Sequence, residues 1–182
     1  ELADTSTLYD ASTAIKRAEM VMRIVREVER YICELGNEGR LVSMQLSELV
    51  NSVQENEICI VRDYHRSGKC ADYEEAAEEI SALPDDELLS LSSICRILGY
   101  TDGVSALDEI ISPRGYRILS KIPRLPVPVI ENLVRYFGSL QCMLKSSIDE
   151  LDGVDGIGSA RAKAVKEGLN RIREQAALQR HI

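Results

Sequence analysis

The 182-residue sequence has few of the side chains from which metal sites and disulfide frameworks are built. Its five cysteines are odd in number and widely spaced, they include no Cys-X-X-Cys pair, and the only histidines are His65 and His181. These counts argue against a bound metal ion and against a set of disulfides. We expect buried or half-buried thiols in a reducing compartment.

Long apolar runs are missing as well. No stretch approaches the roughly 18 apolar residues that span a bilayer, and no secretory signal pattern is visible at the N-terminus. We therefore expect a cytoplasmic protein without a membrane partner. The length suits one medium domain or two small ones.

Strand-like alternation is also absent, and the spacing of apolar residues predicts an all-α fold. Between residues 8 and 35 apolar positions recur every three or four residues, which predicts one long amphipathic helix ending at Gly36. We expect this helix to act as a spine or spacer, or else to form a coiled coil between subunits. Shorter helices are expected at residues 41–53, 58–64, 71–83, 85–98 and 104–111.

Charge divides the chain into two parts. Residues 1–112 contain 10 Lys and Arg against 23 Asp and Glu, a net charge of −13, whereas residues 113–182 contain 12 against 7, a net charge of +5. Because charges are screened beyond about 8 Å in physiological salt, the local field of the basic part governs its encounters. We therefore expect an elongated acidic helical domain, residues 1–112, followed by a basic domain, residues 113–182.

The basic part contains a glycine pair that is typical of a main-chain phosphate site. Gly156 and Gly158 precede a helical pattern with Arg161 and Lys163 in its first turns. Glycine allows a left-handed turn or a close approach of a ligand, and a helix start offers unpaired N–H groups to an anion. Cations are unfavourable at that end of a helix, which indicates that they serve a partner. A plain glycine turn between packed helices is the alternative.

A weaker copy of this pattern lies earlier in the basic part. One constant offset pairs Leu119 with Leu151, Ile122 with Val154, Leu125 with Ile157, Leu133 with Val165 and Phe137 with Leu169. Such a repeat predicts two helical hairpins with one shared core. It resembles the tandem helix-hairpin-helix domain, a module that holds DNA by its backbone. In the first copy Arg124 and Pro126 replace the two glycines, and proline has no N–H to donate.

The wider sequence resembles the DisA family of bacterial DNA-integrity scanning proteins. Ser112-Pro113-Arg114-Gly115-Tyr116-Arg117-Ile118-Leu119 is similar to the start of that family's C-terminal domain. Thr7-Leu8-Tyr9-Asp10, Arg17-Ala18-Glu19-Met20-Val21 and the segment from Leu35 to Leu41 resemble its helical linker. The resemblance covers nearly the whole chain.

The resemblance implies a cyclase domain that this chain lacks. Members of the family join two ATP molecules into cyclic di-AMP with Mg or Mn, in a domain marked by Asp-Gly-Ala and Arg-His-Arg motifs, and neither tripeptide occurs here. The chain also begins at Glu1 without methionine. We expect a fragment that contains no catalytic residues, taken from a diadenylate cyclase that forms homo-oligomers and is nucleoid-associated.

The predicted function is DNA binding that is independent of base sequence and selective for branched DNA such as recombination junctions. Two other classes stay open: a DNA-holding module of a repair or nuclease complex, and a protein-interaction scaffold. Tyr116 lies between two arginines, where we expect it to pack rather than to stack on a base. The residues expected to bind phosphate are Gly156, Ile157, Gly158, Ala160, Arg161, Lys163, Lys166, Arg124, Lys121, Arg114 and Arg117.

Overall fold

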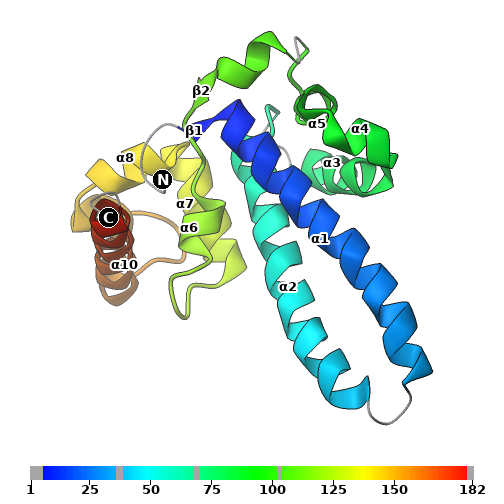
Figure 1. Ribbon diagram of the computed structural model, residues 1–182. Coiled ribbons are helices and arrows are strands. Elements are labelled where there is room, and N and C mark those ends of the chain that lie inside the picture. Colours follow the sequence, from blue (N-terminus) through cyan, green and yellow to red (C-terminus); the bar gives the residue numbers. More distant parts are fainter. Residues whose placement is uncertain (1–5, 36–38, 68–69, 102–103, 180–182) are drawn as a thin grey trace. The chain divides into compact units, whose positions relative to one another are not determined.

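The computed structural model describes residues 6–35, 39–67, 70–101 and 104–179, and these residues are almost entirely helical (Figure 1). They divide into two compact units. One comprises residues 7–109, and the other comprises Ser6 with residues 110–179. The all-α prediction is confirmed. The helices of the first unit are α1 (Leu8–Glu34), α2 (Gly39–Tyr64), α3 (Cys70–Ala82), α4 (Asp85–Leu89) and α5 (Leu91–Ile97).

Helix α1 begins at a capping box, in which the Thr7 hydroxyl accepts a hydrogen bond from the N–H of Asp10 and the Asp10 carboxylate accepts one from the N–H of Thr7. The helix then runs for 27 residues and lies side by side with α2 in an antiparallel hairpin (Figure 1). The long first helix is thus confirmed. The expected stop at Gly36 lies outside the described residues.

Three expectations for this unit are wrong. Residues 41–53 and 58–64 belong to one helix, α2, because the polar residues between them include no glycine or proline to interrupt it. Residues 85–98 form two helices, since Ser90 has an extended backbone with ψ 106°. Residues 104–111 form a 3₁₀ helix, Ser105–Asp108, and a short strand, β2 (Ile110–Ile111), which pairs with β1 (Ser6–Thr7).

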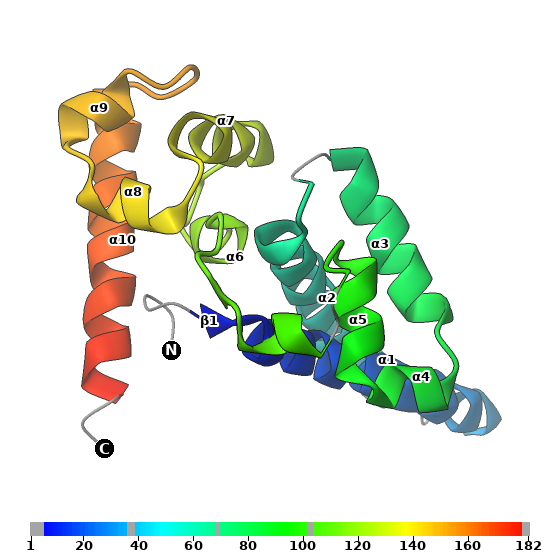
Figure 2. The same ribbon diagram turned by 90° about the horizontal axis from the view of Figure 1, so that it is seen from above.

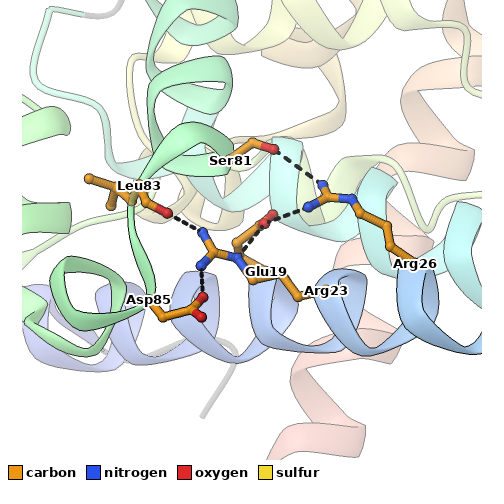
Figure 3. A network of polar contacts seen from close by, with 6 residues as sticks. All are labelled: Glu19, Arg23, Arg26, Ser81, Leu83 and Asp85. Carbon is orange, nitrogen blue, oxygen red and sulfur yellow. Dashed lines mark hydrogen bonds and ion pairs between the residues drawn. The ribbon is translucent and has the colours of Figure 1, made fainter.

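A polar network connects α1 to the end of α3 and the start of α4 (Figure 3). The buried Glu19 carboxylate accepts from Arg23 at 3.1 Å and from Arg26 at 3.3 Å. Arg23 also donates to the Leu83 carbonyl at 2.5 Å and pairs with Asp85. Glu19 is only 2% exposed, so these arginines stabilise a carboxylate that burial would otherwise penalise.

The second unit consists of two helical hairpins joined by α8. Helices α6 (Tyr116–Leu119) and α7 (Val127–Phe137) form the first hairpin, and α9 (Ile148–Asp152) and α10 (Ser159–Gln179) form the second. Helix α8 (Leu140–Lys145) connects them, and both α8 and α9 contact α10 (Figure 2). The constant sequence offset pairs the first residue of α6 with the first residue of α9, and the first residue of α7 with that of α10. The repeat in the sequence is therefore also a repeat in the structure.

Apolar side chains from both hairpins form one core. It contains Ile118, Leu119, Ile122, Val129, Ile130, Leu133, Val134, Leu140, Met143, Leu151, Val154, Ile157, Ala162, Val165 and Leu169, with Leu125 and Tyr116 packed against it. The prediction that the paired residues of the repeat share one core is therefore confirmed. Tyr116 packs as expected. Helix α9 begins at a capping box formed by Ser147 and Glu150.

The cysteines only partly follow expectation. Cys95 is buried and Cys59 half-buried, but Cys33 and Cys142 are exposed, so the prediction of covered thiols is wrong for those two. Among the described residues, no group of three or more histidine, cysteine or acidic side chains is placed to hold a metal ion. None of the helices in these segments is long and apolar enough to cross a membrane.

Candidate nucleic-acid interface

The turn of the second hairpin is built by short-range contacts. The N–H of Val154 donates to Leu151 at 3.2 Å, and the N–H of Ile157 donates to Val154 at 3.0 Å. Gly156 has φ +80°, a left-handed conformation that favours glycine. The chain can therefore turn directly from α9 into α10, with Val154 and Ile157 anchored in the core.

This turn leaves a cluster of main-chain donors unused. In the described part of the chain, the N–H groups of Gly156, Gly158, Ser159 and Ala160 donate to no protein acceptor. All four residues are exposed, and a Cβ added at Gly158 meets nothing within 4 Å. Exposed N–H groups at the start of a helix attract an anion. The corner is therefore open and chemically suited to a phosphate oxygen.

Ile157, grouped by sequence with the phosphate-binding residues, has a different place. Its side chain is 7% exposed and lies in the core, and its N–H closes the turn. Its amide is already committed to Val154. Ile157 therefore positions the neighbouring donors and adds none of its own.

Two side chains hold the turn in place. Asn132 on α7 donates to the carbonyl of Asp155 at 3.0 Å, which connects the first hairpin to the second. Arg161 donates to the carbonyl of Gly156 at 2.8 Å, across the turn. Both contacts use carbonyl oxygens of the turn and none of its N–H groups. The exposed donors of the same turn are left available.

The lysines of α10 differ in whether their ammonium groups already interact with other protein groups. Lys163 is exposed, and among the described residues no ion pair involves it, although Glu167 lies four residues further on the same helix. Lys166 is half-buried and donates to the carbonyls of Leu144 at 2.9 Å and Ser146 at 2.5 Å. Lys166 thus satisfies carbonyls at the end of α8. Its ammonium would have to leave them to reach a phosphate.

The first hairpin follows the same backbone path. Ile122 donates to Leu119 at 3.0 Å and Ile130 to Pro126 at 3.1 Å, and each bond has its counterpart at the equivalent position of the second hairpin. Arg124 takes the place of Gly156 and has φ 62°, the one positive φ outside glycine in the described residues. A left-handed conformation costs an L-residue about 1–2 kcal/mol. The fold therefore keeps the turn despite the missing glycine.

The first hairpin cannot offer the same donors. Pro126 and Pro128 occupy the positions of Gly158 and Ala160, and proline has no N–H. Arg124 and Lys121 are exposed beside this turn, while Arg114 and Arg117 are half-buried and Arg114, Arg117 and Lys121 have other interactions within the structure. The two turns are thus chemically unequal: the second presents amides, and the first presents an arginine.

Several of these contacts have no signal in the sequence. The bonds from Asn132 to Asp155 and from Lys166 to Leu144 join residues far apart in the chain, and polar residues at such separations show no periodicity. The pairing of Glu19 with Arg23 could have been found, because residues four apart on a helix are neighbours.

The geometry defines an all-α protein with two helical hairpins, the second of which has exposed, unused N–H groups at its turn. A family described as "DisA bacterial checkpoint controller linker region" matches residues 1–107. The chain is 57% identical over 178 residues to the "DNA integrity scanning protein DisA" of Clostridium botulinum strain Langeland, an alignment that covers 98% of the chain. It is 54% identical to proteins of that name from Clostridium tetani and Clostridium perfringens strain SM101, over its whole length. The chain belongs to the DisA family of DNA integrity scanning proteins.

The alignments cover about half of each relative. The chain spans 50% of the Clostridium botulinum and Clostridium tetani proteins and 51% of the Clostridium perfringens protein. The family relationship was expected from the sequence and is confirmed.

Proposed function

We propose that the second unit binds the sugar-phosphate backbone of DNA through the turn between α9 and α10. The observation that carries this proposal is the set of exposed, unused N–H groups at Gly156, Gly158, Ser159 and Ala160. They belong to one short segment, and the space beside Gly158 is open. A phosphate oxygen placed there receives main-chain hydrogen bonds, and charge makes such bonds stronger than neutral ones.

Nearby cations complete this site. Arg161 and Lys163 are exposed on the first turns of α10, and Arg124 is exposed on the equivalent turn of the first hairpin. We assign phosphate neutralisation to these three residues. Lys121, Arg114 and Arg117 extend the basic surface, and Lys166 serves mainly to hold α8. Contacts of this kind position a protein on DNA without reading its bases.

The family name supports DNA as the polyanion, and selectivity for branched DNA is the finer part of the proposal. A junction presents backbone segments at angles that a single duplex lacks, which suits two unequal hairpins. A protein-interaction scaffold is the second candidate, because the prolines of the first hairpin remove two of its amides.

For the whole protein we propose the activity that the sequence resemblance implies. A domain outside this chain would join two ATP molecules into cyclic di-AMP with Mg or Mn, in a homo-oligomer located at the nucleoid. In that arrangement the present chain supplies the linker and the DNA contact and does no chemistry itself.

Replacing Gly158 with Asp tests the DNA site directly. The carboxylate both fills the open corner and repels a phosphate. In a mobility-shift titration, the affinity for duplex and for four-way junction should therefore fall by tenfold or more. A loss of this size corresponds to the loss of one charged hydrogen bond, which contributes about 1.5–3 kcal/mol.

Gly153→Asp is the matched control. Gly153 is exposed in the same hairpin with φ −69°, and its own N–H already donates to the carbonyl of Asp149. An aspartate there adds the same charge at a residue that has no unused N–H. We expect it to weaken binding far less. Equal affinity of wild type and Gly158→Asp would rule out the turn as the DNA site and favour the scaffold. Equal affinity of wild type for duplex and junction would rule out junction selectivity alone.

A further inference from the structure

The first unit contains a cavity that the proposed DNA site does not use. It has a volume of about 360 Å³ and lies among α1, α2 and α3. This volume is at the lower end of the range for small-ligand pockets. Its walls are partly apolar, with Met22, Ile58 and Ala77 among the lining residues. A ligand with a short apolar body fits such walls.

Glu57 lines this cavity without a hydrogen bond or a close ion pair among the described residues. It is 9% exposed, and in the described part of the chain no hydrogen bond or ion pair involves its carboxylate. Buried carboxylates are ordinarily paired or hydrogen-bonded, because an isolated one is costly. Glu57 is therefore a buried carboxylate that lines a cavity and, within the described segments, forms no close ion pair, and Arg26 acts on it only electrostatically.

The charges around the cavity leave an excess of carboxylates. Glu19 is satisfied by Arg23 and Arg26, and Arg26 also donates to Ser81 (Figure 3). Arg62 lines the cavity too but has an interaction of its own. Glu74 and Glu78 are one helical turn apart on α3, exposed, and also line the cavity. Three carboxylates, one buried and two exposed, thus line the space without a paired cation among the described residues.

We infer that this cavity binds a small organic cation, an aliphatic amine or a guanidinium, whose charged group pairs with Glu57. The apolar walls contact the carbon chain of the ligand. Glu74 and Glu78 attract the cation to the entrance and hold a second charge if the ligand has one. The same chemistry belongs to a free diamine and to the lysine or arginine side chain of a partner protein.

Protonation of Glu57 makes the proposal measurable. Burial, and to a smaller extent the nearby Glu19, raise the pKa of Glu57 to about 7, although Arg26 lowers it. A cation favours the ionised carboxylate, so binding releases a proton when it starts from the protonated form. Because the ionised fraction rises about tenfold between about pH 6 and about pH 8, the affinity should rise by about the same factor.

Isothermal titration calorimetry of this chain with putrescine and with Nα-acetyl-lysine N-methylamide tests the inference. Wild type should bind at one site, and Glu57→Gln should bind at least about tenfold more weakly. Glu55→Gln is the matched control, because Glu55 is exposed on the same helix and does not line the cavity. It should bind as wild type does.

The outcomes separate the two sources of the ligand. Tighter binding of putrescine indicates a free diamine, and tighter binding of the capped lysine indicates a partner's side chain. Absence of saturable heat with both probes overturns the inference, as does wild-type affinity in Glu57→Gln. Should Glu57→Gln fail to fold, the wild-type titration still decides: affinity that does not change between about pH 6 and about pH 8 excludes Glu57 as the cation's partner.

Discussion

Arg124 holds a backbone angle that belongs to a glycine at the equivalent position of the second hairpin. Its φ of 62° lies close to the φ of +80° at Gly156, and hydrogen bonds before and after the two turns also match. Strained backbone persists where the surrounding structure requires it, and it often marks a functional residue. The arginine brings a charge to a turn whose prolines supply no amides.

Replacing Arg124 with Gly should separate stability from binding. Glycine removes the left-handed strain, so the free energy of unfolding in urea should rise by about 0.5–1 kcal/mol relative to Arg124→Ala, which keeps the strain. Both variants should bind DNA more weakly, since both lose the charge. Equal stability of the two variants would show that the turn tolerates a side chain without strain.

Helix α10 lies against the first hairpin at a position where only glycine fits easily. A Cβ at Gly168 would lie 3.0 Å from both Cδ1 and Cγ1 of Ile122, and Ile122 is 5% exposed. Because the core is closely packed, the Ile122 side chain cannot readily move away from an added Cβ. The contact joins the two hairpins into one core.

Gly168→Ala should therefore destabilise the second unit. Alanine in a helix ordinarily stabilises by about 1 kcal/mol relative to glycine, but overpacking in a core costs about 1–3 kcal/mol. We expect the free energy of unfolding in urea to fall by about 1 kcal/mol. In the double variant with Ile122→Val, it should fall by less than the sum of the two single losses. Glu167→Ala, exposed on the same helix, should change little. A gain in stability from Gly168→Ala would contradict the packing argument.

At the scale of the whole molecule, charge is unevenly distributed along the chain. The net charge is −13 over residues 1–112 and +5 over residues 113–182. A chain with an overall charge of −8 can bind a polyanion when the local field at the site is positive, because salt screens the distant charges. Binding should consequently depend strongly on salt.

The salt dependence of DNA affinity measures how many phosphates are contacted. Engagement of about four phosphates on a duplex predicts a slope of roughly −3.6 in a plot of log K against log salt. Arg161→Ala with Lys163→Ala should flatten it by up to about two units, whereas Arg40→Ala, exposed in the acidic part, should leave it unchanged. A wild-type slope near zero would contradict a backbone-binding interface.

The sequence alone determined the features that depend on near neighbours. Apolar residues every three or four positions predicted α1, and the constant offset between the hairpins predicted the shared core. Each is a relation between residues a few positions apart, or between equivalent positions of a repeat. Such relations are visible as periodicity because helix geometry repeats along the chain.

Only the tertiary structure decided which polar groups are satisfied and which are left bare. It showed that the N–H of Ile157 closes a turn, that Lys166 holds α8, and that Asn132 reaches Asp155. It also showed that Glu57 lines a cavity without a hydrogen bond or close ion pair among the described residues. Most of these contacts join residues far apart in the sequence. Whether a donor is used depends on what packing brings within about 3 Å of it, and no local pattern records that distance.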